Sequence, residues 1–157
     1  MGNGYPLSGV IGKAEIMDLP EIGNMSSTHS ANPMACAVGL AVLEEIESGD
    51  LINESHRKGN LLKSKLNELK EVSQGRISHV LGEGLISAIL FQDPVTGAAD
   101  DLIASQISEK CYEKGLLVVH TGRESIKLGP PLTISDEALF EGIDIIIESF
   151  NEVVKTK

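Results

Sequence analysis

The chain has 157 residues, a formal net charge of −10 at pH 7 and a hydrophobic content of 41%. This acidity argues against nucleic acids and anionic membrane surfaces as partners, because both attract basic proteins. The length and hydrophobic content suffice for the core of one compact domain. No apolar run approaches the ~20 residues of a membrane span, and no signal core follows the amino terminus. We therefore expect no membrane partner and a cytoplasmic location.

The first 30 residues are rich in Gly, Pro and Ser and contain one short strand candidate, residues 8–12. Ser27, Thr28 and Ser30 then stand immediately before Asn32-Pro33 and a long apolar segment. A helix start carries unpaired backbone N–H groups and the positive end of the helix dipole, and neighbouring hydroxyls add donors. This segment predicts an anion site, although the same residue types also serve as ordinary helix caps.

Hydrophobic periodicity and turn residues predict the remaining elements. We expect helices over residues 32–47, 50–72, 100–114 and 136–155, and strands over residues 77–81, 85–91, 116–120 and 125–128, with a hairpin turn at Gly82-Glu83-Gly84. The first helix has a predicted buried stripe of Met34, Val38, Leu40, Val42, Leu43 and Ile46. Helices that alternate with strands in this order predict an α/β fold, or an α+β-like variant, with a mixed or antiparallel sheet packed against helices.

Cysteine and histidine residues give no metal signal. Cys36 and Cys111 lie in expected helices without C-x-x-C spacing, and we interpret both as reduced core thiols. His29 has no visible metal-ligating or acidic partner, so packing or solvent exposure is the preferred interpretation. We expect no metal site.

A family resemblance rests on segments spread over essentially the whole chain. They are Met1-Gly2-Asn3-Gly4-Tyr5-Pro6, Thr28-His29-Ser30-Ala31-Asn32-Pro33, Gly82-Glu83-Gly84-Leu85, Glu113-Lys114-Gly115-Leu116-Leu117-Val118 and Ile126-Lys127-Leu128-Gly129-Pro130-Pro131-Leu132-Thr133-Ile134-Ser135. In this order they resemble the class III (subgroup II) pyridoxal-phosphate-dependent aminotransferases, which have fold type I.

The resemblance places the family's Schiff-base lysine just before Met1. The family's Gly-rich phosphate loop, its ring-stacking aromatic residue and the aspartate that pairs with the pyridine nitrogen have no counterparts in this sequence. We therefore expect the carboxyl-terminal portion of a fold-type I enzyme. Residues 1–30 are then a remnant of the large cofactor-binding domain, and residues 31–157 form the small carboxyl-terminal domain together with the connecting helix 32–47.

The resemblance also implies roles for individual residues. Thr28 matches the threonine that reaches the cofactor phosphate of the neighbouring subunit, Ser27 is a second candidate donor, and a helix cap is the structural alternative. Lys127 stands where many members carry an arginine that grips the substrate carboxylate. An ammonium makes only a point contact with a carboxylate. Either Lys127 binds the carboxylate less specifically, or the amino donor has no carboxylate there and is an amine, amino sugar or ω-amino acid. Arg123 is a possible substitute, but we prefer its interpretation as a solvated loop charge.

The function implied is amino transfer from an amino acid or amine to a 2-oxo acid, with pyridoxal phosphate as cofactor, in a homodimer. The missing lysine is both the covalent anchor and the proton-transfer base. We therefore expect the isolated chain to be inactive and assign it no catalytic residue. The alternative is a non-enzymatic remnant that acts only as a dimerisation or binding module.

Overall fold

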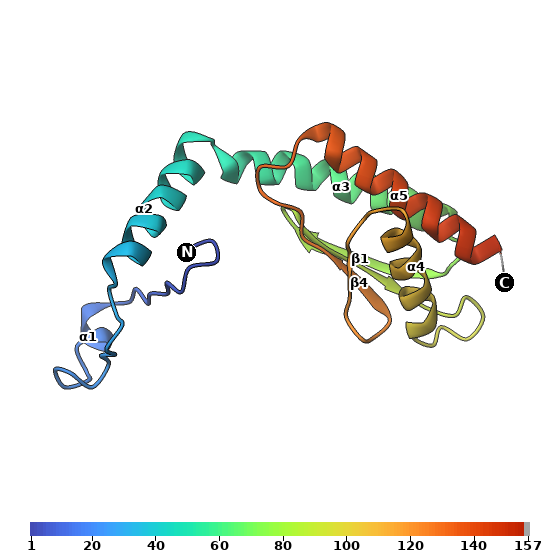
Figure 1. Ribbon diagram of the computed structural model, residues 1–157. Helices are drawn as coiled ribbons and strands as arrows, with labels where there is room; N and C mark the ends of the chain where they lie inside the picture. Colours follow the sequence, from blue (N-terminus) through green and yellow to red (C-terminus); the bar gives the residue numbers. More distant parts are fainter. Residues whose placement is uncertain (156–157) are drawn as a thin grey trace. The chain divides into compact units, whose positions relative to one another are not determined.

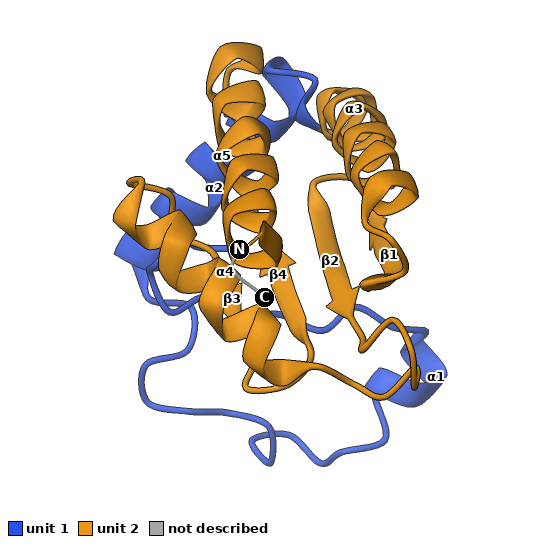
Figure 2. Cartoon of the chain, turned by 90° about the vertical axis from the view of Figure 1, so that its right-hand side faces the viewer, with its two compact units in different colours: residues 1–51 blue, residues 52–157 orange. Residues whose placement is uncertain are grey.

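The computed structural model describes residues 1–155, which fall into two compact units, Met1–Leu51 and the described part of Ile52–Lys157 (Figure 2). Helices α1 and α2 belong to the first unit, and α3 begins at its last residue (Figure 1). The sequence interpretation grouped α2 with the small domain instead. The predicted boundary at residue 31 concerns the complete enzyme and stays a prediction.

The first unit contains little regular structure before α2. Its only regular elements ahead of that helix, among the described residues, are α1 (Ala14–Met17) and an isolated bridge between Gly2 and Tyr5. The strand predicted over residues 8–12 is wrong, since these residues pair with no other segment, and Val10 and Ile11 are exposed. A strand is stable only where neighbouring backbone satisfies its N–H and C=O groups.

Helix α2 (Pro33–Ser48) confirms the predicted helix within one residue. Its predicted buried stripe is wrong: the buried residues are Ala35 and Gly39, whereas Met34, Leu40 and Leu43 are exposed. The periodicity is real, but the first unit has no second apolar layer against which this stripe packs.

The second unit is built on a four-stranded antiparallel sheet in the order β1-β2-β4-β3, which confirms the predicted fold class. Its strands are β1 (Ile77–Glu83), β2 (Ile86–Phe91), β3 (Val119–His120) and β4 (Ser125–Leu128), and its helices are α3 (Leu51–Val72), α4 (Asp101–Glu113) and α5 (Asp136–Lys155).

Strand β3 is shorter than the predicted 116–120. Val119 pairs with Lys127, so the same register carried backward would set Leu117 opposite Gly129 and Leu116 opposite Pro130. Proline has no N–H to donate to a ladder. Pro130 therefore bars an extension of β3 as far as Leu116, and the observed ladder already ends at Val119.

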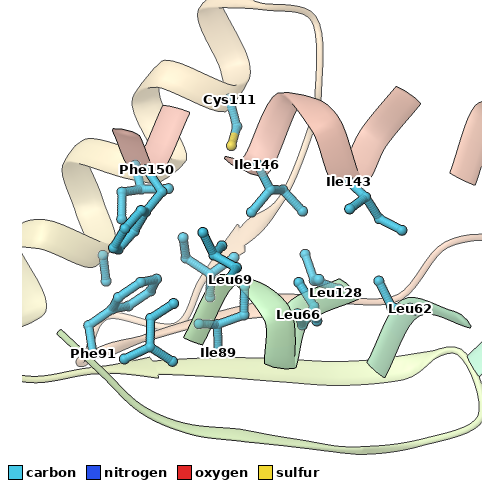
Figure 3. Packing of buried hydrophobic residues seen from close by; sticks show 14 of the residues in the cluster. Leu62, Leu66, Leu69, Ile89, Phe91, Cys111, Leu128, Ile143, Ile146 and Phe150 are labelled. Carbon is cyan, nitrogen blue, oxygen red and sulfur yellow. The ribbon is translucent and has the colours of Figure 1, made fainter. Parts of the chain in front are cut away.

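One hydrophobic core lies between the three helices and one face of the sheet (Figure 3). The rings of Phe91 on β2 and Phe150 on α5 stack with centroids 6.5 Å apart. The buried cluster also takes Leu62, Leu66 and Leu69 from α3, Ile103, Ala104, Ile107 and Cys111 from α4, and Ile143 and Ile146 from α5. On the opposite sheet face Leu81, Ile86 and Val119 are exposed, so the second unit has two layers.

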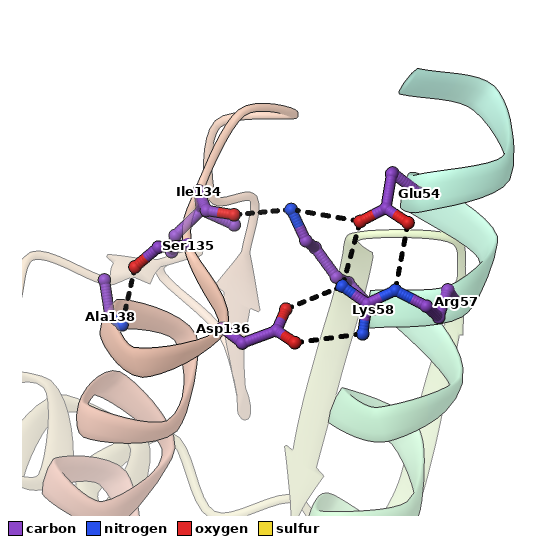
Figure 4. Close-up of polar contacts among 7 residues, drawn as sticks. All are labelled: Glu54, Arg57, Lys58, Ile134, Ser135, Asp136 and Ala138. Carbon is purple, nitrogen blue, oxygen red and sulfur yellow. Dashed lines mark hydrogen bonds and ion pairs between the residues drawn. The ribbon is translucent and has the colours of Figure 1, made fainter. Parts of the chain in front are cut away.

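A polar clamp of Glu54, Arg57, Lys58 and Asp136 joins α3 to the start of α5 (Figure 4). The Arg57 guanidinium donates to both carboxylate oxygens of Asp136 at 3.0 and 2.7 Å, and to both of Glu54 at 3.0 and 2.9 Å. Lys58 is buried, and its Nζ donates to the Ile134 carbonyl at 2.6 Å. The clamp thereby fixes the connection from β4 to α5.

Candidate functional site

The start of α2 is capped by Asn32. Its Oδ1 accepts hydrogen bonds from the backbone N–H groups of Met34 at 3.0 Å and Ala35 at 3.4 Å, and Pro33 occupies the first helical turn. The capping function considered for Thr28 and Ser27 therefore falls to Asn32 in this structure. The two hydroxyl residues need another explanation.

Ser27 and Ser30 close a turn ahead of this cap. Their hydroxyl oxygens lie 2.7 Å apart, and the Ser30 N–H donates to the Ser27 carbonyl at 3.1 Å. The Thr28 side chain is exposed at the turn, and its hydroxyl forms no hydrogen bond with any residue from 1 to 155. Thr28 is thus an available donor beside a helix start, whereas the Ser27 hydroxyl is shared with Ser30.

Lys127 lies in the second unit, on β4. Its neighbours Ile126 and Leu128 point into the core and are buried, so Lys127 projects from the opposite face and is exposed. Ala88 of β2 and Val119 of β3 flank it across the strands. Its ammonium forms no ion pair or hydrogen bond within the part of the chain that the structure describes. A cation without a partner can receive an external anion.

Arg123, the other candidate for a carboxylate contact, lies in the turn between β3 and β4. Its Nε is 3.5 Å from a Glu124 carboxylate oxygen, and its side chain is 77% exposed. It behaves as a solvated loop charge. Thr28 and Lys127 belong to different units.

A groove with a volume of about 290 Å³ opens beside Lys127. Its walls are the segment 116–119 and the chain 127–131, and α5 supplies most of the floor. Every lining side chain is apolar, a glycine or a proline, except Lys127. The sequence analysis missed this groove, because its walls and floor come from segments far apart in the sequence.

Other reactive groups add no site. Cys111 is buried in the core and Cys36 is half-buried, both as free thiols, and burial raises the pKa of the Cys111 thiol. Residues 1–155 contain no cluster of three His, Cys, Asp or Glu side chains suited to a metal ion. None of the helices in this range has the length and apolarity needed to cross a membrane.

Comparison with known proteins gives a consistent result. A family model described as aminotransferase class-III matches residues 1–150. The chain is 34% identical over 153 residues to the mitochondrial acetylornithine aminotransferase of Candida glabrata, covering 98% of this chain and 34% of that protein. It is 36% identical over 148 residues to a 4-aminobutyrate aminotransferase of Mycobacterium bovis, covering 93% and 33%.

A solved structure shares the fold. The ornithine aminotransferase of Toxoplasma gondii, in which pyridoxal phosphate partly occupies the active site, superimposes with a TM-score of 0.82 at 28% identity. The match covers 93% of this chain and 33% of that one. The chain thus spans about a third of the length of the curated relatives it matches.

Proposed function

Because the chain belongs to the class-III aminotransferase family, we propose that it is the carboxyl-terminal portion of a pyridoxal-phosphate-dependent enzyme. The complete enzyme transfers an amino group from an amino acid or amine to a 2-oxo acid. The observation that carries this proposal is the family match over residues 1–150. The chain itself supplies parts of the cofactor and substrate sites.

Thr28 and Ser27 are the proposed contacts to the cofactor phosphate. Bound pyridoxal phosphate supplies the electron sink for amino transfer. The Thr28 hydroxyl suits the phosphate because it is exposed, has no partner among residues 1–155 and stands ahead of the positive end of α2. Ser27 is the weaker donor because it shares its hydroxyl with Ser30.

Lys127 is the proposed contact to a substrate carboxylate. Its exposed ammonium has no competing acidic partner in the described chain. The residue lies on β4, which pairs with β2 on one side and with β3 on the other. A lysine binds a carboxylate as a point charge and sets its orientation less strictly than an arginine does. We infer a looser grip on the donor than an arginine would give.

The test is Thr28→Ala in the complete polypeptide that contains this segment. We expect pyridoxal phosphate affinity to fall by about ten- to hundred-fold, because a charge-assisted hydrogen bond worth roughly 1.5–3 kcal/mol is lost. Equilibrium dialysis of the cofactor measures the change. Thermal stability should change little, since Asn32 still caps α2.

Asn32→Ala and Thr133→Ala are the matched controls. Asn32→Ala should lower the unfolding free energy by about 1 kcal/mol through loss of the cap. Thr133 is exposed on the β4–α5 connection, and its replacement should leave cofactor affinity unchanged. If Thr28→Ala holds the cofactor as tightly as the parent while melting several degrees lower, Thr28 is structural and the assignment is wrong.

The isolated chain should show no amino transfer. None of the residues that resemble the family matches the lysine that anchors the cofactor and moves the proton. The measurements are amino transfer to 2-oxoglutarate or pyruvate and borohydride trapping of a pyridoxyl adduct. Steady turnover together with an adduct at one unique lysine would overturn this expectation, whereas a folded chain without either would fit the alternative binding module.

The complete protein is proposed to act as a cytoplasmic homodimer. Support for the dimer comes from the family resemblance and from the exposed apolar residues of the first unit. The location is tested by cell fractionation, because a Candida glabrata relative is named as mitochondrial.

A further inference from the structure

The hydroxyl of Ser30 is used twice inside the turn formed by residues 27–30. Its Oγ accepts a hydrogen bond from the Ser27 backbone N–H at 3.2 Å and lies 2.7 Å from Ser27 Oγ. The Ser30 N–H also donates to the Ser27 carbonyl at 3.1 Å, which closes a four-residue turn with Thr28 and His29 at its centre. Three contacts between Ser27 and Ser30 therefore fix the turn that carries Thr28.

The direction of the bond between the two serine hydroxyls determines which proton faces outward. A serine hydroxyl has one donor and two acceptor positions, and one acceptor position of Ser30 Oγ is used by the Ser27 N–H. When Ser30 donates to Ser27 Oγ, Ser27 keeps its own proton for an external anion, despite the shared contact. Both donors of Ser30, its N–H and its O–H, are then used inside the turn, so Ser30 has no donor left for that anion.

The residue after the turn has an unusual backbone conformation. Ala31 has a φ of 53°, in the left-handed region that residues with a Cβ rarely adopt. Such a conformation persists only where the surroundings hold it. Here the contacts of Ser30 with Ser27 hold the chain on one side, and the Asn32 cap of α2 holds it on the other. Together they set the direction in which the chain passes from the turn into α2.

Given the phosphate contact proposed for Thr28, on which this inference rests, we propose that Ser30 is a positioning residue for the cofactor phosphate. It holds the turn in the shape that presents the Thr28 hydroxyl, and it orients the Ser27 hydroxyl as the second donor. A segment that is ordered before binding loses less conformational entropy when the anion binds. Ser30 thereby raises cofactor affinity without touching the phosphate.

The experiment measures pyridoxal phosphate affinity of the complete polypeptide by equilibrium dialysis, which does not depend on turnover. Ser30→Ala removes both hydroxyl contacts and should weaken cofactor binding by roughly three- to tenfold. Ser30→Thr keeps the hydroxyl and should bind within about twofold of the parent. Ser26→Ala is the matched control, because the Ser26 hydroxyl donates to the Gly23 carbonyl at 2.9 Å and forms no hydrogen bond with the described residues 27–30. Its cofactor affinity should equal that of the parent.

A direct contact and a positioning role are separated by repeating Ser30→Ala in a Ser27→Ala/Thr28→Ala background. Both proposed phosphate donors are absent there, so Ser30 has no donor hydroxyl left to position. Its replacement should then change cofactor affinity by less than about twofold. If Ser30 itself touched the phosphate, the loss would be the same in both backgrounds. Melting temperatures should stay close to that of the parent for all these variants, since Asn32 still caps α2.

Several results would overturn the proposal. They are parent-like affinity of Ser30→Ala, failure of Ser30→Thr to restore binding, an equal loss with Ser26→Ala, or an undiminished loss in the Ser27→Ala/Thr28→Ala background. Parent-like affinity of Ser30→Ala beside a weakened Thr28→Ala would leave the proposed function intact. Parent-like affinity of Thr28→Ala would instead remove the phosphate assignment itself, and the role of Ser30 with it.

Discussion

Arg57 is the residue through which α3 holds the beginning of α5. It contacts Asp136 and Glu54 by two hydrogen bonds each. The guanidinium therefore lowers the pKa of both carboxyl groups, and the two carboxylates raise the pKa of Arg57. Bidentate geometry of this kind orients both partners better than a single contact.

The clamp should make stability depend on pH in one direction. A folded-state pKa below the ordinary value stabilises the native state above that value, and the contribution disappears as pH falls through the folded-state pKa. The ordinary values are 3.8 for Asp136 and 4.5 for Glu54. We expect Arg57→Gln to lower the melting temperature at pH 7 and to have progressively less effect in acid below this range.

Melting curves of the parent and Arg57→Gln from pH 7 to pH 2 measure this dependence. Lys65→Gln is the control, because within residues 1–155 Lys65 pairs only with Glu68 of the same helix and isolated surface pairs contribute little. A destabilisation by Arg57→Gln that is independent of pH would assign the effect to packing of the Arg57 stem.

At the scale of elements, α3 approaches the β1–β2 turn at Gly59. A Cβ at Gly59 would collide with the backbone of Gly84, which itself has a positive φ of 54° and lies against Ser55. Gly59→Ala should therefore lower the unfolding free energy by about 1–3 kcal/mol, as overpacking against rigid backbone does. Urea unfolding measures the change.

Gly142→Ala is the matched control for this substitution. Gly142 is also helical, but a Cβ there makes only an ordinary contact, 3.5 Å from Leu116 Cδ1. Ala has a higher helix propensity than Gly, so the unfolding free energy should rise by up to about 1 kcal/mol. If both substitutions change stability equally, the close approach of α3 to the turn is not rigid.

At the scale of the whole molecule, the first unit leaves much apolar surface exposed. Val10, Ile11, Leu19, Ile22 and Met25 are each more than three quarters exposed. Exposed apolar surface of this kind is usually covered by association. We expect the chain to form at least a dimer in light scattering. A monodisperse monomer with residues 1–30 ordered would contradict this prediction.

Local patterns predicted most elements of the second unit, β3 being the exception. Helical periodicity predicted α3, α4 and α5, and Gly82-Glu83-Gly84 predicted the β1–β2 hairpin, although β1 itself extends through Glu83. Asn32-Pro33 likewise marked the start of α2. These signals work because capping, turn geometry and periodic burial depend on residues close together in sequence. The same motifs, in order, also indicated the family.

Only the tertiary structure decided what depends on distant partners. Residues 8–12 have the composition of a strand but no strand beside them, and the apolar stripe of α2 has no layer to cover it. Arg57 and Asp136, 79 positions apart, meet only because α3 and α5 share one core. The groove beside β4 lies where β3 has already stopped pairing, so its walls come from segments that only the folded chain brings together. Burial, ion pairing and cavity shape are properties of the packed chain, and no single segment contains them.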